Sequence, residues 1–362
     1  MSAPPSPQRH EAVRDQRIER FEPLVAPGEL LSELPLGDGH TTVVLEGRQQ
    51  IHAVLDGEDD RLLVVVGPCS VHDPVATLDY ADRLATVAER LKDDVLIAMR
   101  VYFEKPRTTT GWKGLINDPH LDGSGDVDAG LRIARRLLLD ILERGLPIGC
   151  EFLDPITPQY ISDAVCWGAI GARTTESQIH RQLGSGLSMP VGFKNRTDGN
   201  VQVAVDAVRA AAISHAFAGI AADGRSAIIH TRGNRDCHVI LRGGKNAPNY
   251  GEDAVAHTLN LLHKAALPER VMIDLSHDNS GKDPDRQPAI ARAIGRHIAE
   301  GRRAIVGTML ESFIVGGRQE LTSDQELTYG QSITDGCLGW DATVEVLDGL
   351  AHAVRERRAV AT

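Results

Sequence analysis

Eight short apolar runs in this chain each end beside a residue that can bind a charge or a metal ion. The runs and the residues that follow them are 62–67 with Cys69, 95–99 with Arg100, 147–150 with Glu151, 169–172 with Arg173, 191–193 with Lys194, 239–241 with Arg242, 271–275 with His277, and 304–310 with Glu311. Because a reactive residue stands within two positions of the end of every run, the pattern predicts one site to which all eight runs contribute.

Cationic side chains form the larger part of this predicted site. They are Arg100, Lys105, Arg107, Arg173, Lys194 and Arg242. Six like charges around a partly buried pocket are costly unless an anion neutralises them. Arginine matches carboxylate and phosphate oxygens, and lysine supplies a point charge. A salt bridge at a rim explains any single one of these residues, whereas the whole set favours a small phosphorylated and carboxylated substrate.

Four other side chains have the types expected of a metal site. They are Cys69, His277, Glu311 and Asp335. A thiol, an imidazole and two carboxylates suit a divalent transition-metal ion better than Mg2+ or Ca2+, which prefer oxygen ligands. Taken alone, Cys69 is explained as a small buried hydrophobic residue and His277 as a hydrogen-bonded core histidine. Their joint position with Glu311 favours a metal, because the first, seventh and eighth runs become neighbours if the strands close into a barrel.

The elements that would position these groups alternate along the chain. Parallel strands buried on both faces are continuous apolar runs, as these eight are. Helical periodicity fills the gaps at 76–92, 127–144, 157–166, 175–186, 200–212, 252–266, 286–300 and 342–356. Eight strands alternating with eight helices predict an α/β fold, the (β/α)8 TIM barrel, whose active site lies at the carboxyl ends of the strands. An open sheet would instead concentrate its ligand at one switch point.

Three segments exceed what a barrel needs. Residues 1–60 form an N-terminal extension with one expected helix near 41–56, and residues 61–362 form the catalytic barrel. A long loop occupies 101–126, and a small extra β-hairpin is expected at about 215–236. Long loops in compact domains are commonly functional.

Composition excludes several classes of protein. The chain has 362 residues, a formal net charge of -11 and 4% aromatic residues, which argues against a nucleic-acid partner. Its five cysteines are odd in number and lack CxxC spacing, so no disulfide framework is expected. With no signal-peptide pattern and no apolar run long enough for a membrane helix, we expect a cytoplasmic protein without a membrane partner.

Seven blocks of residues, in order from about residue 60 to 340, resemble those of one enzyme family. The blocks are 67–74 (GPCSVHDP), 100–114 (RVYFEKPRTTTGWKG), 171–178 (GARTTESQ), 190–195 (PVGFKN), 238–244 (HVILRGG), 274–280 (DLSHDNS) and 307–312 (GTMLES). They are similar to the class I 3-deoxy-D-arabino-heptulosonate 7-phosphate (DAHP) synthases, the microbial branch regulated by aromatic amino acids. The resemblance implies condensation of phosphoenolpyruvate with D-erythrose 4-phosphate and water, which is the first step of the shikimate pathway.

The resemblance also implies roles for individual residues. Phosphoenolpyruvate would be bound by Arg100, Lys105, Arg173, Lys194 and Arg242. Erythrose 4-phosphate would be contacted by Pro106, Arg107, Thr108 and Asp335. A divalent ion (Mn2+, Fe2+, Co2+ or Zn2+) would be held by Cys69, His277, Glu311 and Asp335. The catalytic group would comprise Cys69, His277, Lys105 and Glu151, with either Lys105 or a water held by Glu151 moving protons.

Regulation and assembly are implied in the same way. In the family, the N-terminal extension and the hairpin build both the oligomer contacts and an inhibitor site for an aromatic amino acid. The resemblance therefore implies a homodimer or homotetramer. The matching residues here are Pro155, Gln159, Leu187 and Ser188. Pro155 with Ser188 slightly favours tyrosine as effector, although Pro155 could also merely shape its loop. Arg196 and Gln331 depart from the family pattern and bear on substrate detail rather than on reaction class.

Two other functions compete with this interpretation. The related eight-carbon sugar acid phosphate synthase, which uses arabinose 5-phosphate, is disfavoured by the long loop after the second run and by the extension. A non-catalytic barrel that responds to amino acids is disfavoured by the intact set of cations and metal ligands.

Overall fold

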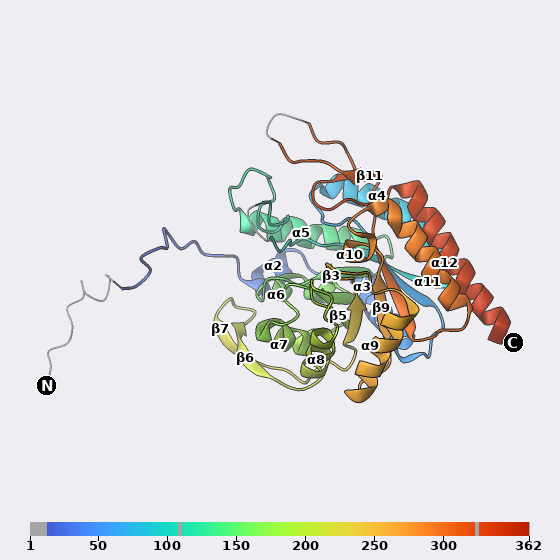
Figure 1. Ribbon diagram of the computed structural model, residues 1–362. Coiled ribbons are helices and arrows are strands. Elements are labelled where there is room, and N and C mark those ends of the chain that lie inside the picture. Colours follow the sequence, from blue (N-terminus) through green and yellow to red (C-terminus); the bar gives the residue numbers. More distant parts are fainter. Residues whose placement is uncertain (1–12, 108–110, 323–325, 362) are drawn as a thin grey trace, which may run out of the picture.

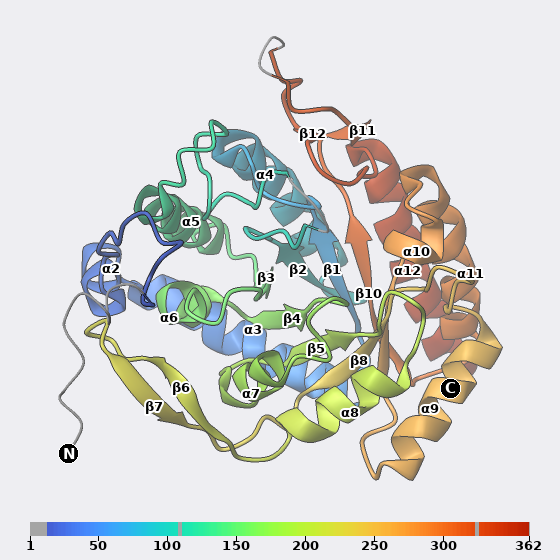
Figure 2. The same ribbon diagram turned by 60° about the vertical axis from the view of Figure 1, so that its left-hand side comes forward.

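The computed structural model of this protein describes residues 13–107, 111–322 and 326–361. Eight parallel strands close into a barrel in the order β1-β10-β9-β8-β5-β4-β3-β2 (Figures 1 and 2). The strands are β1 (Leu62–Gly67), β2 (Val95–Arg100), β3 (Ile148–Glu151), β4 (Trp167–Ile170), β5 (Val191–Lys194), β8 (His238–Leu241), β9 (Val271–Asp274) and β10 (Ile305–Glu311). The predicted (β/α)8 barrel is therefore confirmed, and the first, seventh and eighth runs are neighbours as expected.

The barrel strands are buried along their whole length, which explains their continuous apolar sequences. Parallel register pairs Gly67 of β1 with Glu311 of β10, so the ends of these strands lie at one level. At Gly67 an added Cβ would lie 2.4 Å from the carbonyl oxygen of Arg100. Only glycine allows β1 and β2 to approach so closely beneath the strand ends.

Helices cover the outside of the barrel between successive strands (Figure 2). They are α4 (Pro74–Leu91), α5 (Val127–Leu142), α6 (Pro158–Ile161) with the 3-10 turn η1 (Ser162–Ala164), α7 (Gln178–Gly186), α8 (Gln202–Ala211), α9 (Glu252–Lys264), α11 (Gln287–Ala299) and α12 (Trp340–Ala361). Asp73 begins α4 by accepting hydrogen bonds from the backbone N–H groups of Val75 and Ala76. The amphipathic periodicity predicted these helices to within a few residues at most ends.

The N-terminal extension contains two helices where one was expected. They are α2 (Pro27–Glu33) and α3 (Asp38–Asp56). The second begins before residue 41, because the ring nitrogen Nδ1 of His40 accepts the N–H of Gly37 and closes the first turn. Residues 13–24 are exposed and run outward from the body of the molecule (Figure 1).

Outside the barrel, β6 (Ala216–Ile220) pairs antiparallel with β7 (Ser226–His230), within the hairpin segment expected from the sequence (Figure 2). Four small elements were not predicted: α10 (His277–Ser280), η2 (Pro284–Arg286), β11 (Val315–Arg318) and β12 (Gln331–Ser332). Each is too short to leave a periodic pattern. Among the described residues, no helix is long and apolar enough to cross a membrane.

Candidate active site

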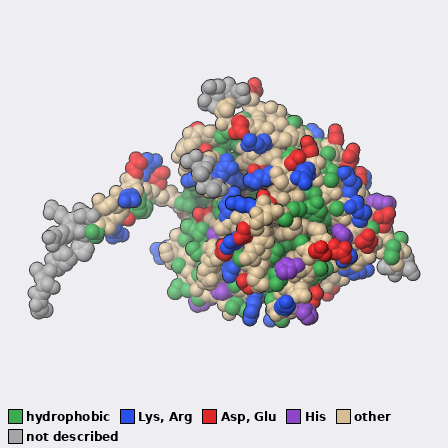
Figure 3. Space-filling model, in the orientation of Figure 1, with side chains coloured by type: hydrophobic (Ala, Val, Ile, Leu, Met, Phe, Trp, Pro, Cys, Tyr) green, Lys and Arg blue, Asp and Glu red, His purple; other side chains and the backbone are tan. Residues whose placement is uncertain are grey.

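A cavity of about 280 Å³ lies at the carboxyl ends of the barrel strands. Its lining residues include Lys105, Pro106, Arg107, Glu151, Arg173, Lys194, Thr197, Arg242, His277, Lys282, Thr334 and Asp335. Lys and Arg side chains gather near the middle of the face shown in Figure 3. Five of the six predicted cations thus meet at one cavity. Lys282, after β9, is a further cation that no apolar run indicated.

Arg100, the sixth predicted cation, lies beneath the cavity and is fully buried. Its Nη2 donates to Oε1 of Glu311 at 2.8 Å and to the carbonyl oxygen of Cys69 at 3.1 Å. Its guanidinium carbon also lies 3.5 Å from the ring centroid of Tyr102. Burial opposes its charge, but the neighbouring Tyr102 and Glu311 outweigh burial and raise the pKa of Arg100. Arg100 therefore remains a cation and joins the ends of β1, β2 and β10.

Acidic partners accompany the other buried cations. The Nζ of Lys194 lies 3.8 Å from Oε2 of Glu151 and 3.5 Å from Oδ2 of Asp274. Burial disfavours the charge on Asp274, yet His277 and Lys194 hold its pKa well below the usual range. The sequence prediction missed Asp274, although it begins the 274–280 block at the end of β9.

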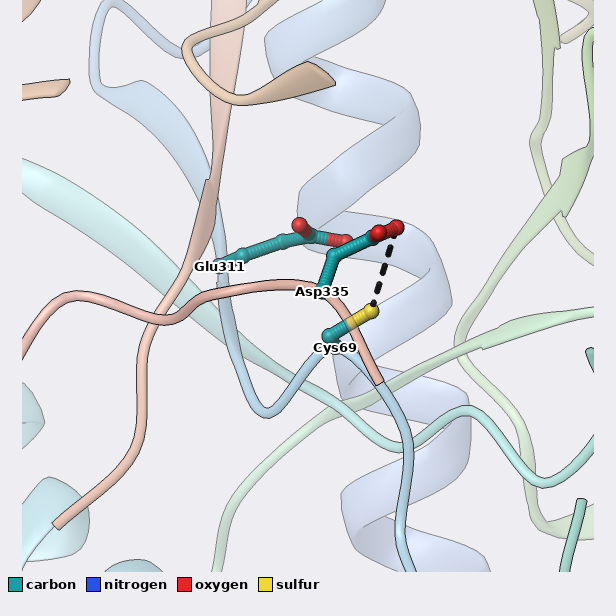
Figure 4. A group of neighbouring side chains, drawn as sticks. All are labelled: Cys69, Glu311 and Asp335. Atoms are coloured by element: carbon teal, nitrogen blue, oxygen red, sulfur yellow. Dashed lines mark hydrogen bonds between the residues drawn. The ribbon is translucent and has the colours of Figure 1, made fainter. Parts of the chain in front are cut away.

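The predicted metal ligands converge from three strand ends. Ligand atoms of Cys69, Glu311 and Asp335 all lie within 4.8 Å of one another, and their side chains point toward a common centre (Figure 4). The Sγ of Cys69 lies 3.8 Å from Oδ2 of Asp335. Gln287 holds Glu311 in place by bonding both its backbone N–H and its carbonyl oxygen.

The fourth predicted ligand, His277, lies against the same group. Its Nε2 is 3.6 Å from Oε1 of Glu311, while its Nδ1 is 2.8 Å from Oδ2 of Asp274. An acidic partner on the far ring nitrogen is the usual support of a metal-binding histidine. His277 has a φ of 53°, a left-handed conformation that is uncommon for residues other than glycine.

This donor set fits a divalent transition-metal ion. Among the described residues, the thiol of Cys69 and the carboxylates of Glu311 and Asp335 form the group with metal-binding spacing, and the imidazole of His277 lies beside them without being part of it. Burial and the charge of Glu311 raise the pKa of the Cys69 thiol, whereas Lys105 lowers it. The Nζ of Lys105 lies 2.9 Å from the Cys69 sulfur. An ion that binds here must therefore displace the thiol proton.

The loop after β2 carries the residues predicted to meet the second phosphate. Pro106 and Arg107 line the cavity, and Arg173 donates to the carbonyl oxygen of Pro106. The N–H of Lys105 donates to the carbonyl oxygen of Lys113 at 2.9 Å, which folds the loop back on itself. Thr108 lies outside the described residues.

Glu104, in the same loop, was missed by sequence reasoning. It is buried, accepts a hydrogen bond from the hydroxyl of Thr157 at 3.0 Å, and accepts others from the N–H groups of Leu153 and Asp154. Burial raises the pKa of Glu104 to about 7. Glu104 thereby joins the loop after β2 to the loop after β3, which contains Pro155.

The predicted effector residues are not all brought together. Ser188 lines a second cavity of about 260 Å³ with residues of α3 and η1, whereas Pro155, Gln159 and Leu187 do not line it. Pro155 is exposed in the loop after β3, and Leu187 is buried before β5. Arg196, which departs from the family pattern, pairs with Asp198 and with Glu176 at 2.9 Å.

The fold and the site together define a (β/α)8-barrel enzyme whose reactive groups stand at the carboxyl ends of the strands. The family model described as the DAHP synthetase I family matches residues 41–348. This chain belongs to that family.

Curated relatives span almost the whole chain. It is 55% identical over 344 residues to the Phe-sensitive phospho-2-dehydro-3-deoxyheptonate aldolase of Escherichia coli K12, covering 95% of this chain and 98% of that protein. It is 48% identical to the tyrosine-inhibited enzyme of the same name from Candida albicans, covering 99% and 98%. A solved structure of phospho-2-dehydro-3-deoxyheptonate aldolase from Francisella tularensis superposes with a TM-score of 0.92 at 48% identity, covering 94% of this chain and 99% of that one.

Proposed function

We propose that this chain condenses phosphoenolpyruvate with D-erythrose 4-phosphate and water to give DAHP and inorganic phosphate, the first step of the shikimate pathway. The observation that carries the proposal is the cationic cavity that adjoins the cluster of Cys69, Glu311 and Asp335. Family membership and the name of the E. coli relative support the same reaction.

Phosphoenolpyruvate carries two anionic groups, and the cavity offers cations to both. Arg173, Lys194 and Arg242 line it. The buried Nε of Arg242 has no hydrogen-bond partner among the described residues, so a donor is available for a substrate oxygen. Arg100 and Lys105 would add positive charge from below and beside the carboxylate. The phosphate of erythrose 4-phosphate would then be bound in the loop of Pro106, Arg107 and Thr108.

The bonds follow from this arrangement. C3 of phosphoenolpyruvate bonds to the aldehyde carbon, and the oxygen of water bonds to C2. The C2–O bond to phosphate then breaks and releases inorganic phosphate. One proton of the water ends on the new C4 hydroxyl and the other on the phosphate. Holding the two substrates in one cavity makes the carbon–carbon step effectively unimolecular.

Two side chains can move the protons. The Nζ of Lys105 stands beside the metal-binding cluster and could donate toward the aldehyde oxygen. Glu151, near Lys194 at the end of β3, could orient the attacking water. A bound divalent ion (Mn2+, Fe2+, Co2+ or Zn2+) would supply Lewis-acid chemistry at the aldehyde oxygen; its proposed ligands are Cys69, His277, Glu311 and Asp335.

Phosphate release tests the proposal directly. Purified protein should release phosphate only when phosphoenolpyruvate and erythrose 4-phosphate are both present, and D-arabinose 5-phosphate should not replace the second substrate. Treatment with a chelator should lower the rate by about a hundredfold or more, and Mn2+ or Co2+ should restore it. Release that is independent of erythrose 4-phosphate would overturn the reaction, and release that is unaffected by chelation would overturn the metal.

Feedback inhibition by an aromatic amino acid is part of the proposal. The relatives include Phe-sensitive and tyrosine-inhibited enzymes, which supports an aromatic effector. Pro155 with Ser188 slightly favours tyrosine, and the site would also involve Gln159 and Leu187. We further propose a cytoplasmic homodimer or homotetramer with contacts through residues 1–60 and the hairpin. Inhibition assays with tyrosine, phenylalanine and tryptophan, each on its own, distinguish the effectors; no response to tyrosine would remove that preference.

A further inference from the structure

Three buried asparagines meet behind Arg242. Asn195 follows β5, Asn249 lies in the loop after β8, and Asn279 lies in α10 after β9. Their exposed fractions are 0%, 8% and 2%, respectively. They come together because β5, β8 and β9 are neighbours in the barrel, so the carboxyl ends of these strands lie side by side.

The asparagines bond to one another in a chain. The Nδ2 of Asn249 donates to Oδ1 of Asn195 at 3.0 Å, and the backbone N–H of Asn249 donates to Oδ1 of Asn279 at 2.8 Å. Asn279 in turn donates from Nδ2 to the carbonyl oxygens of Leu241 and Asp274. Loops after β5, β8 and β9 are thereby joined without any charged group.

This chain of amides holds the backbone of Arg242 and Gly243. The N–H of Arg242 donates to Oδ1 of Asn195 at 2.8 Å, and the carbonyl oxygen of Arg242 accepts from the N–H of Asn279 at 3.3 Å. The N–H of Gly243 donates to Oδ1 of Asn249 at 2.7 Å, and its carbonyl oxygen accepts from Nδ2 of Asn195 at 2.9 Å. All four backbone polar groups of this dipeptide are therefore held by asparagines.

The turn at Gly243 leaves no room for adjustment. Its φ is 79°, and an added Cβ would lie 2.4 Å from the backbone nitrogen of Asn279. The backbone of Arg242 is thus fixed, whereas its guanidinium has only Asp278 as an acidic partner and keeps an unpaired Nε among the described residues.

Carboxamides suit this position better than carboxylates would. Asn195 accepts two hydrogen bonds at Oδ1 and donates two from Nδ2, to the carbonyl oxygens of Arg196 and Gly243. An ionised carboxylate can only accept. It would also add negative charge close to Lys194 and Arg242 and so weaken the cavity as an anion site.

We propose that Asn195, Asn249 and Asn279 are positioning residues that fix Arg242 for the anionic groups of phosphoenolpyruvate. This inference rests on the proposed function and extends it to residues that do not line the cavity. A guanidinium displaced by about 1 Å binds its anion less well. Displacements of this size can lower the rate of an enzyme by up to about a hundredfold.

The test compares Asn249→Ala with Asn234→Ala. Asn234 is a buried asparagine at the opposite end of the barrel, where its Nδ2 donates to the carbonyl oxygens of Gly184, Leu187 and Met189. We expect Asn249→Ala to raise the KM for phosphoenolpyruvate by about tenfold or more, with kcat and the KM for erythrose 4-phosphate within about threefold. Asn234→Ala should lower the unfolding temperature and leave both KM values unchanged.

A purely structural role would give a different result. If Asn249→Ala unfolds earlier but keeps the KM for phosphoenolpyruvate, or raises both KM values equally, the proposal is overturned. Asn279→Ala, which removes the acceptor of the Asn249 N–H without adding a charge, provides the same comparison if Asn249→Ala does not fold.

Calorimetric binding of phosphoenolpyruvate alone separates this inference from the proposed function. Weaker binding to Asn249→Ala than to the unaltered protein supports positioning, and equal binding overturns it. Failure of the unaltered protein to turn over both substrates would instead overturn the proposed reaction.

Discussion

At the scale of the residue, each buried cation at the carboxyl ends of the barrel strands lies next to a carboxylate. Arg100 bonds Glu311, Lys194 lies between Glu151 and Asp274, and Arg242 pairs with Asp278. An uncompensated group of buried cations would be unstable in the absence of substrate. Each buried cation therefore has an acidic neighbour, and an anionic substrate would bind by adding to or replacing these pairs.

Replacing Cys69 tests the metal-binding cluster. Because its sulfur is the softest donor beside Glu311 and Asp335, Cys69→Ala should lower metal-dependent kcat by about a hundredfold or more and reduce the metal content of the purified protein. Cys237→Ala is the matched control, since Cys237 is also buried but lies before β8 at the opposite end of the barrel. Full activity of Cys69→Ala after chelation would contradict the assignment.

His238, at the start of β8, should make stability depend on pH. Burial lowers its pKa to about 3, and its Nε2 accepts a hydrogen bond from Nε1 of Trp167 at 3.2 Å. Below the ordinary pKa of 6.5 the unfolded chain binds a proton at this residue and the folded chain does not. The free energy of unfolding should therefore fall by up to about 1.4 kcal/mol per pH unit, because of this residue, as the pH falls from 6 toward 4.

The variant His238→Gln removes this titration and retains an acceptor for Trp167. Denaturant unfolding at pH 7 and pH 5 should show a smaller loss of stability on acidification for His238→Gln than for the unaltered protein. His257→Gln, at an exposed position, should behave like the unaltered protein. Equal losses in all three would exclude a neutral buried His238.

At the scale of the element, one buried arginine fastens the extension to the barrel. Arg135 of α5 donates to the carbonyl oxygen of Leu34 at 2.7 Å, next to α2, and to that of Tyr160 in α6 at 2.9 Å. It also forms an ion pair with Asp163 in η1 at 2.7 Å. Helix α2 of the extension is therefore joined to the barrel as part of the folded unit.

Arg135→Ala should consequently destabilise the whole protein. It leaves the Leu34 carbonyl and the half-buried Asp163 carboxylate without this donor, a change that typically costs about 1–3 kcal/mol. Arg136→Ala, at the exposed neighbouring position, should change the free energy of unfolding by less than about 0.5 kcal/mol. Denaturant unfolding measures both, and similar values for the two variants would refute the role of Arg135.

At the scale of the whole molecule, the net charge of the chain is negative, whereas most charged side chains that line the cavity are positive. The chain carries a formal net charge of -11, yet the cavity at the barrel mouth is lined by Lys105, Arg107, Arg173, Lys194, Arg242 and Lys282. Net charge therefore argued against a nucleic-acid partner without predicting the sign of the site. Because net charge is an average over the surface, it says little about one cavity.

Much of the fold followed from local pattern. Each barrel strand is buried on both faces, so its sequence is continuously apolar, and the residue after it lies at the carboxyl end. This is why the sequence alone places Cys69, Arg173 and Lys194 at the same end of the barrel. Helix α3 began earlier than expected because its start depends on the ring of His40, a contact that periodicity does not encode.

Features that depend on contacts between distant strand ends were decided only by the tertiary structure. The sequence alone predicted that the eight strand-end residues lie at the carboxyl ends of the barrel strands, and they do. Their pairing was not predicted, because Arg100 meets Glu311 across 211 positions of sequence and no periodicity relates them. The same holds for the asparagines behind Arg242, which come from the ends of β5, β8 and β9. Sequence determines which residues end each strand, and the order and closure of the strands in the barrel determine which of them touch.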